Sequence, residues 1–232
     1  MNELLDFNLG DIHIPDIMQR TVFIIGGKGS GKTKTLKMMA YTFLQDEIPV
    51  YIFDPLAQIK IDGFKIITIN KKMCAEAALI KTAKLPTILE KTTDKHIIFH
   101  FKQLLSEEIV AWANIFFGGW HPHDVMILVD EAQEFAPERG MGLEYSGDFE
   151  RAVRHWRNQN VGFVMATQRP AFTSKKVLGL LDELVLYRVT YNNDLKVVKE
   201  LINNKLTGEE SQKVLSQLQT SKFLEGVQIA FI

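Results

Sequence analysis

The sequence predicts an α/β fold in which a central, mostly parallel sheet is flanked by helices. Short apolar runs alternate along the chain with stretches of helical periodicity, which is the pattern of parallel strands joined by crossover helices. Several runs, such as Met126-Ile127-Leu128-Val129, are continuously apolar, as strands covered on both faces are. A glycine-rich segment at residues 26–33 directly follows the first run. These observations together predict a layered sheet with a tight loop at the end of its first main strand.

The expected elements follow one another in a regular order. Strands are expected at 21–25, 49–53, 64–69, 96–101, 125–129, 161–167, 184–190 and near 227–232. Helical spacing after the glycine-rich segment predicts a helix whose buried face is formed by Leu36, Met39, Ala40, Phe43 and Leu44.

The chain is expected to form one domain with a short addition. Its 232 residues and 46% hydrophobic content suit a single core. Residues 1–20 are expected to be an N-terminal extension, where Pro15 argues against a long helix, and residues 21–232 the domain itself. Residues 137–148 contain a proline and several glycines and predict a mobile loop.

Charge and cysteine content exclude several classes of protein. The formal net charge of −1 provides no global basic field for nucleic acid, so any DNA contact must be local. Cys74 is the only cysteine, which excludes an internal disulfide and favours a reducing cytoplasm. The sequence has no apolar run of membrane-spanning length and no signal-peptide profile, so stable membrane insertion is not expected.

The segment Gly26-Gly27-Lys28-Gly29-Ser30-Gly31-Lys32-Thr33 matches the phosphate-loop (Walker A) pattern G-x-x-x-x-G-K-[ST]. Glycines let backbone N–H groups turn toward an anion, and the following helix directs its positive end at the same point. Lys32 is expected to reach the β- and γ-phosphates and Thr33 to bind Mg²⁺. The alternative, a ligand-free glycine turn, does not account for the Lys-Thr pair. The predicted nucleotide-binding residues are Gly26, Gly27, Lys28, Gly29, Ser30, Gly31, Lys32, Thr33 and Lys34, of which Lys28 is expected to be solvated.

A second motif ends the apolar run Val125–Val129 with Asp130-Glu131. In a phosphate-loop protein, a buried strand that ends in Asp is the Walker B site. Asp130 is then expected to hold Mg²⁺ through water, and Glu131 to act as general base on the attacking water. The alternative is a helix N-cap with solvated charges. An Asp-Glu pair favours hydrolysis over phosphoryl transfer to a small acceptor.

A third motif, Ala166-Thr167-Gln168-Arg169-Pro170, completes the strand at 161–167. With Gly26–Thr33 and Ile127-Leu128-Val129-Asp130-Glu131-Ala132-Gln133, it resembles the FtsK/HerA superfamily of ring-forming translocases. The stretch Leu186–Asp194 also resembles the strand and turn that follow the third motif in that family. The resemblance covers about residues 20–200. It implies a RecA-like P-loop NTPase fold with a central, mostly parallel sheet.

The resemblance also implies roles for individual residues. Gln168 corresponds to the sensor of the γ-phosphate, and Arg157 to an arginine that acts on the nucleotide of a neighbouring subunit. Arg151 and Arg154 compete for that role, and the alternative for two of the three is a solvated basic face. Arg188 is either a further arginine near the site or a structural residue.

Other residues have two open interpretations. Asp54 resembles a family position near the nucleotide and is equally consistent with a turn. Lys175 and Lys176 are candidate DNA contacts or part of a solvated loop. His96 and His100 are interpreted as strand histidines rather than zinc ligands. Three aromatic residues at helical spacing are interpreted as part of the core or of a subunit interface, namely Trp112, Phe116 and Phe117.

Among family members, the chain resembles the minimal DNA-packaging ATPases of membrane-containing double-stranded DNA viruses. This resemblance implies Mg²⁺-dependent ATP hydrolysis, double-stranded DNA as partner, and a homo-hexamer when active, with a monomer when free. Capsid or vertex proteins would be further partners, and the location would be the host cytoplasm or the virion. The rival hypotheses are a zonula-occludens-toxin-like assembly or secretion ATPase and a non-hydrolysing nucleotide switch. A small-molecule kinase ranks last, because no arginine-rich lid is recognisable.

Overall fold

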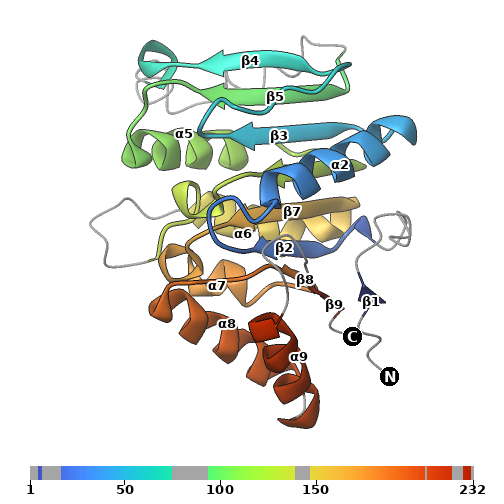
Figure 1. Cartoon of the computed structure of the whole chain (residues 1–232). Helices are drawn as coiled ribbons and strands as arrows, with labels where there is room; N and C mark the ends of the chain where they lie inside the picture. The colour runs from blue at the N-terminus through green and yellow to red at the C-terminus, as the bar shows by residue number, and fades with distance from the viewer. Residues whose placement is uncertain are drawn as a thin grey trace.

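One sheet forms the centre of the molecule in a computed structural model that describes residues 5–6, 17–74, 94–138, 147–206, 208–220 and 227–230. Within these ranges the sheet has nine strands in the order β1-β9-β8-β2-β7-β6-β3-β5-β4. The seven from β8 to β4 are parallel, and β9 and β1 add antiparallel pairs at one edge (Figure 1). The strands are β1 Leu5–Asp6, β2 Thr21–Ile25, β3 Val50–Asp54, β4 Lys65–Ile69, β5 His96–Phe101, β6 Val125–Val129, β7 Val161–Thr167, β8 Glu183–Leu186 and β9 Val227–Ala230.

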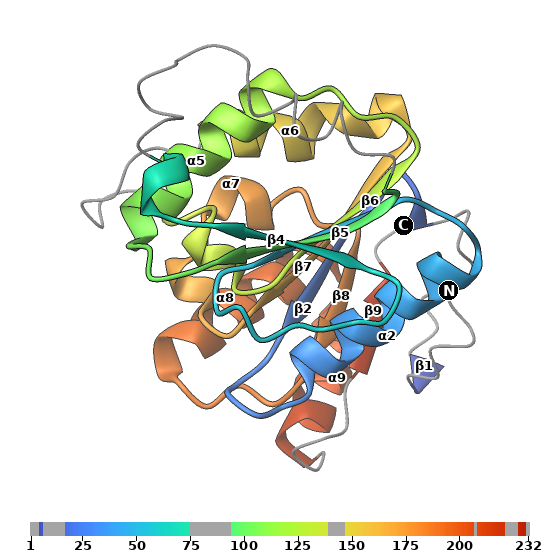
Figure 2. The same cartoon turned by 90° about the horizontal axis from the view of Figure 1, so that it is seen from above.

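Helices cover both faces of this sheet. α2 lies on one face, and α5 and α6 lie on the other (Figure 2). α8 and α9 lie near the β8 side of the sheet (Figure 1). The helices are α2 Lys32–Gln45, α5 Ser106–Gly119, α6 Gly147–His155, α7 Lys175–Leu178, α8 Asn192–Lys205 and α9 Gly208–Thr220. Within the described ranges, short 3-10 helices also follow the strands or helices, namely η2 Ala132–Glu134, η3 Trp156–Gln159 and η4 Pro170–Phe172.

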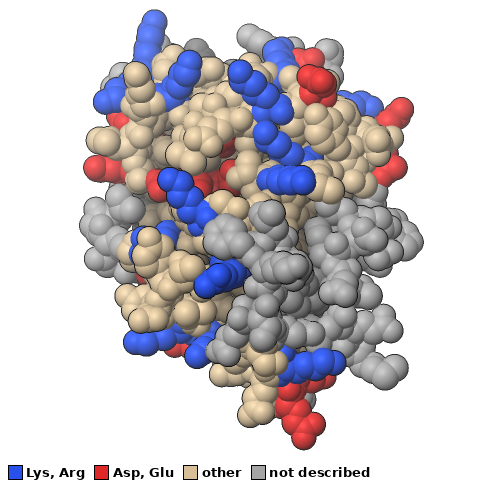
Figure 3. Space-filling view, viewed as in Figure 1, with Lys and Arg blue, Asp and Glu red and all other residues tan. Residues whose placement is uncertain are grey.

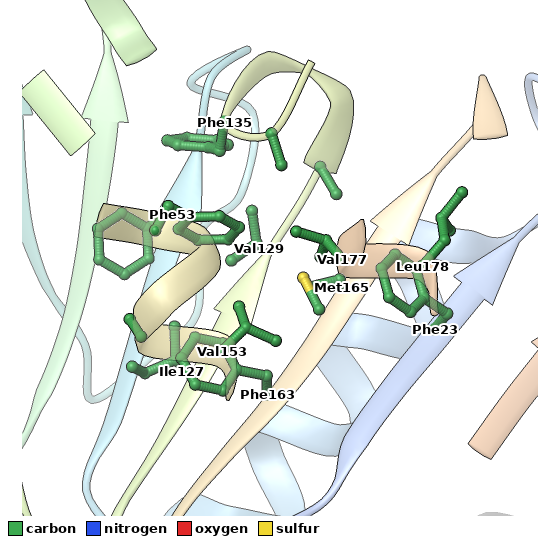
Figure 4. Packing of buried hydrophobic residues seen from close by; sticks show 14 of the residues in the cluster. Phe23, Phe53, Ile127, Val129, Phe135, Val153, Phe163, Met165, Val177 and Leu178 are labelled. Atoms are coloured by element: carbon green, nitrogen blue, oxygen red, sulfur yellow. The ribbon is translucent and has the colours of Figure 1, made fainter. Parts of the chain in front are cut away.

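The strands bury both of their faces, as their continuous hydrophobicity predicts. Along β6, Ile127 and Val129 belong to the cluster under α5 and α6, whereas Met126 and Leu128 belong to the cluster under α2. Figure 4 shows the first of these clusters, in which Phe53 of β3 lies beside Val129. Each fully buried aliphatic or aromatic side chain contributes about 1.5–3 kcal/mol, so the two clusters hold the strand ends in fixed positions.

The aromatic residues of α5 are core residues. Trp112 and Phe116 stack with their ring centroids 4.9 Å apart, and both pack on Phe53 and Phe99. Trp112, Phe116 and Phe117 are at most 3% exposed. The packing interpretation of this set is therefore confirmed within the subunit.

The expected α/β fold is confirmed, and the strand at 184–190 is shorter than predicted. β8 ends at Leu186, because its partner β2 ends at Ile25 and turns into the glycine-rich loop. The predicted loop at 137–148 falls mostly on residues 139–146, outside the described residues, and its last two residues already belong to α6. The end of the strand near 227–232 also lies outside them.

Strand pairing crosses the predicted boundary between residues 1–20 and the domain. Leu5–Asp6, within the expected extension, pairs antiparallel with β9.

Among the described residues, no helix has the length and apolar character needed to cross a membrane.

Candidate nucleotide-binding site

The strands that carry the three motifs are neighbours and end at the same edge of the sheet. β7 pairs in parallel with β2 on one side and with β6 on the other. Adjacent strands lie about 4.8 Å apart, so β2 and β6 lie about 10 Å apart. The phosphate loop, Gln168 and Asp130 therefore meet at the carboxyl edge of the sheet, where ligands bind in folds of this class.

The backbone of the phosphate loop favours glycine at several positions, of which Gly31 and Gly26 show two different reasons. Gly31 has φ of 105°, a left-handed conformation that disfavours other residues. A Cβ on Gly26 would lie 2.6 Å from the Cβ of Tyr187 and from Ser30 Oγ. The loop is thus built against β8 at its start and turns sharply into α2 at its end.

The N-terminus of α2 is suited to an anion. Its first turn holds no acidic residue, and no side chain caps it, so its positive end is not neutralised locally. Lys32 is buried, and its Nζ donates to the carbonyl of Gly27 at 2.9 Å. Burial lowers the pKa of Lys32, while the charges of Glu131 and Asp130 act in the opposite direction. Lys28 and Lys34 are exposed, as expected for Lys28.

Thr33 and Asp130 form an oxygen-lined position beside the loop. Thr33 Oγ1 donates to Asp130 Oδ2 at 2.9 Å, and the backbone N–H of Glu131 donates to Oδ1 at 3.1 Å. Burial, and next the charge of Glu131, raises the pKa of Asp130 to about 6. A hydroxyl and a carboxylate in contact fit Mg²⁺, which takes few protein ligands and fills its shell with water and phosphate oxygens. Within the described ranges, no three His, Cys, Asp or Glu side chains form a metal-binding group.

The carboxylate of Glu131 is held by two side-chain amides. Gln168 Nε2 donates to Oε1 at 3.0 Å, and Gln133 Nε2 donates to Oε2 at 2.8 Å. Glu131 is 8% exposed and has φ of 48°, which is uncommon outside glycine and concentrates at functional positions. The structure thus brings the predicted base and the predicted sensor together. The motif Ile127–Gln133 ends in Gln133, but its spacing alone gives this residue no role.

Arg169 ties the third motif to α8. Its Nε donates to Asp194 Oδ2 at 3.1 Å, and Asp194 Oδ1 accepts the backbone N–H of Ala171 at 3.0 Å. The guanidinium also lies over the rings of Phe172 and Tyr191, at 4.0 and 5.0 Å. Asp194 is fully buried. The segment that presents Gln168 is therefore fixed by an ion pair whose carboxylate is buried and whose guanidinium is partly exposed.

Asp54 fits the turn interpretation. One of its oxygens accepts the backbone N–H of Leu56, and the other accepts those of Gln58 and Ile59. His100 of β5, a strand histidine as expected, lies 3.5 Å from the same carboxylate. The carboxyl of Asp54 is thus used to fold the loop after β3.

Arg157 lies at the end of β7 that is remote from the site of its own subunit. Arg157 is in η3, before β7 begins, whereas Gln168 follows the end of that strand. A strand of seven residues spans about 20 Å. Arg151, Arg154 and Arg157 are all exposed, and Arg151 lies 3.3 Å from Asp148.

Arg188 is next to the loop through its backbone. Its carbonyl accepts the N–H of Gly27 at 2.9 Å, while its side chain is exposed. It lines a hollow of about 250 Å³ together with Val189, Leu195 and Lys199. The backbone of Arg188 therefore supports the start of the loop, and the role of its side chain stays a prediction.

Lys175 and Lys176 lie in a short helix rather than in a loop. They begin α7, and both are exposed. The backbone N–H of Lys175 donates to Glu138 Oε2 at 2.7 Å, so this turn is fixed to the chain that follows β6. The expectation of a loop is wrong here, because Glu138 satisfies a free donor at the start of the helix.

Comparison with known proteins identifies relatives over most of the chain. The family model described as zonular occludens toxin (Zot) matches residues 20–190. The genome packaging NTPase B204 from Sulfolobus turreted icosahedral virus 2, solved with AMPPCP, has 14% identity and a TM-score of 0.58, covering 92% of this chain and 93% of its own. B204 from Sulfolobus turreted icosahedral virus, a DNA-packaging ATPase, has 15% identity and a TM-score of 0.58, covering 93% and 94%. VirB4 of Thermoanaerobacter pseudethanolicus has 12% identity and a TM-score of 0.63, covering 91% and 87%.

These likenesses confirm the P-loop NTPase fold and the resemblance to the FtsK/HerA superfamily. No curated protein matches the chain.

Proposed function

We propose that this chain, which belongs to the zonular occludens toxin (Zot) family, hydrolyses ATP with Mg²⁺ and uses the reaction to move double-stranded DNA. A P-loop ATPase role is supported by the family and by the fold. The observation that carries hydrolysis is the contact between Glu131 and Gln168 beside the pair formed by Thr33 and Asp130. It unites residues from three separate motifs at one sheet edge.

The geometry suggests a role for each residue. The N–H groups of the loop and Lys32 hold the phosphates. Thr33 and Asp130 hold Mg²⁺, which would neutralise charge on the β- and γ-phosphates. Glu131 orients a water molecule and accepts its proton as the water oxygen attacks the γ-phosphorus, and ADP leaves. Gln168, hydrogen-bonded to Glu131, would sense the γ-phosphate.

We place the second half of the site on a neighbouring subunit. Arg157 lies at the opposite end of β7 from Gln168, so it can serve only the site of another copy. Arg154 and Arg151, both in α6, are the alternatives. A shared site of this kind requires a ring, for which we propose a homo-hexamer, with a monomer as the free form.

DNA is the proposed substrate of the motor. Lys and Arg dominate the charged groups on the face that carries α2, and Asp and Glu gather mostly at its margins (Figure 3). Local basic surface of this kind suits contact with phosphates although the chain has a net charge of −1. Lys175 and Lys176 are the candidate contacts on α7, and the B204 relatives are named as packaging enzymes. The remaining proposed partners are capsid or vertex proteins in the host cytoplasm or virion.

The match to the Zot family favours a second candidate function. In this alternative the same ATPase site drives assembly or secretion of a protein partner. The two functions share every residue of the site and differ in what stimulates it.

The test is ATP hydrolysis measured across a range of protein concentrations, with and without double-stranded DNA. A DNA motor with a shared site shows a rate per subunit that rises with protein concentration and rises further with DNA. A rate that ignores DNA but responds to a protein partner supports the assembly function. Absence of turnover under all of these conditions contradicts both and leaves a nucleotide switch.

A further inference from the structure

We propose that Gln133 is a positioning residue that aims the carboxylate of Glu131, and that the hydroxyl of Thr167 fixes the amide of Gln133. This inference rests on the proposed hydrolysis of ATP. It concerns residues that support Glu131 from behind. Neither the sequence motifs nor the relatives assign a role to them.

The carboxylate of Glu131 has two hydrogen-bond partners of different kinds. Gln168 contacts Oε1 from the tip of β7, on the side where the phosphate loop lies. Gln133 contacts Oε2 from η2, directly after β6. Because each amide holds a different oxygen, Gln133 can keep the carboxylate oriented while Gln168 engages a phosphate.

Gln133 is in turn held by the core of the protein. Its Oε1 accepts a hydrogen bond from Thr167 Oγ1 at 2.7 Å, and Thr167 is fully buried at the end of β7. The hydrogen bonds therefore connect the buried strand residue Thr167, through Gln133, to the predicted base Glu131. A carboxylate supported in this way loses few rotamers when it reaches the reactive geometry.

The direction of the hydrogen bonds from Thr167 to Glu131 follows from the carboxylate of Glu131, which can only accept. The backbone N–H of Arg169 donates to Thr167 Oγ1, so the hydroxyl proton of Thr167 remains available for Gln133. The hydroxyl of Thr173, 3.1 Å from that of Thr167, can donate to the carbonyl of Arg169 at 3.2 Å. The amide of Gln133 must then present its NH₂ group to Glu131. The reversed amide would place an oxygen against the carboxylate.

Three variants test the chain of contacts. Gln133→Met removes the amide but keeps a side chain of similar length. Thr167→Val removes the hydroxyl but keeps the shape of the side chain, and Thr167→Ser keeps the hydroxyl. We expect kcat for ATP to fall about 10- to 100-fold in the first two, with KM within about threefold of wild type, since only the orientation of the base changes. Thr167→Ser is expected to stay within about threefold of wild-type kcat. The double variant Gln133→Met/Thr167→Val is expected to be no slower than Gln133→Met, because the two residues act in series.

Thr173→Val is the matched control. Thr173 is as buried as Thr167, and its hydroxyl lies in the same cluster without contacting Gln133. We expect the midpoint temperature of thermal unfolding to fall by a similar amount in Thr167→Val and Thr173→Val, whereas only Thr167→Val lowers kcat. A purely structural role of Thr167 predicts equal kcat in both.

The outcomes separate this inference from the proposed function. If wild type hydrolyses ATP and Gln133→Met keeps the wild-type kcat, or loses activity only through KM, the inference is wrong and the function stands. If Gln133→Met does not fold, the comparison of Thr167→Val with Thr167→Ser decides in the same way. If wild type does not hydrolyse ATP under any of the conditions given above, both fail.

Discussion

The two sides of the candidate site are built by different means. The phosphate loop is a backbone structure, in which Gly31 supplies a left-handed turn and Lys32 folds onto the carbonyl of Gly27. The carboxylate side is a side-chain structure, in which Thr167 and Gln133 hold Glu131 across two strands. A backbone loop can bind phosphates without these side chains. From this comparison we predict that nucleotide binding and the proposed hydrolysis depend on separable parts of the molecule.

The largest expected effect comes from breaking the loop side. Lys32→Ala removes the buried cation that we propose to contact the phosphates, and we expect ATP affinity to fall about 100-fold or more, with turnover lost as a consequence. Nucleotide binding by fluorescence or calorimetry measures this. Lys28→Ala is the control, because Lys28 is exposed in the same loop, and its affinity change should stay within about threefold. Equal losses in both variants would contradict the assignment of Lys32.

The support behind the carboxylate side is expected to be a stability element. Asp194→Ala removes the buried carboxylate that accepts hydrogen bonds from Arg169 and from the backbone N–H of Ala171, and we expect the free energy of unfolding to fall by about 2–3 kcal/mol. Denaturant unfolding measures the change. Asp148→Ala removes the exposed pair with Arg151 and should change it by at most about 0.5 kcal/mol. Similar values for the two variants would mean that Asp194 does not anchor the third motif.

A smaller effect is expected at Asp130, where the free energy of unfolding and Mg²⁺ binding should respond differently to substitution. The pKa of Asp130 is raised by burial and by Glu131 to about 6, above its ordinary value of 3.8. The folded state therefore favours the protonated form, and this contribution to stability is present below about pH 4 and is lost as the pH rises through about 6. Without metal, we expect Asp130→Asn to be more stable than wild type by about 1–3 kcal/mol at about pH 8.

The same variant has its own internal controls. The stability difference should vanish near pH 4, where wild-type Asp130 is protonated, and unfolding across pH in the presence of a chelator measures it. Mg²⁺ with ATP should stabilise wild type more than Asp130→Asn. A variant that is less stable than wild type at every pH would contradict the raised pKa.

The sequence predicts the loop side more completely than the carboxylate side, and the reason is physical. The positions of Gly26, Gly31 and Lys32 are set by local backbone geometry, so their spacing along the chain is sufficient. Hydrophobic runs likewise place the strands, because burial on both faces requires them.

The contacts between strands are set by packing instead. That Gln133 and Gln168 share one carboxylate depends on β6 and β7 being neighbours with a particular register. The sequence places both residues at strand ends but contains no distance between them. The end of β8 and the helical turn at Lys175 were missed for the same reason, since each depends on a partner segment distant in sequence, β2 and Glu138.

The most direct test of the account compares wild type with Glu131→Gln in a single-turnover assay of phosphate release from Mg²⁺-ATP, alongside nucleotide binding. Glutamine keeps the size of the side chain but cannot accept the proton of the attacking water. We predict that phosphate release falls at least about 100-fold while ATP affinity stays within about threefold. Release at the wild-type rate, or a parallel loss of ATP binding, would contradict the claim that the carboxylate side converts a binding loop into a hydrolytic site.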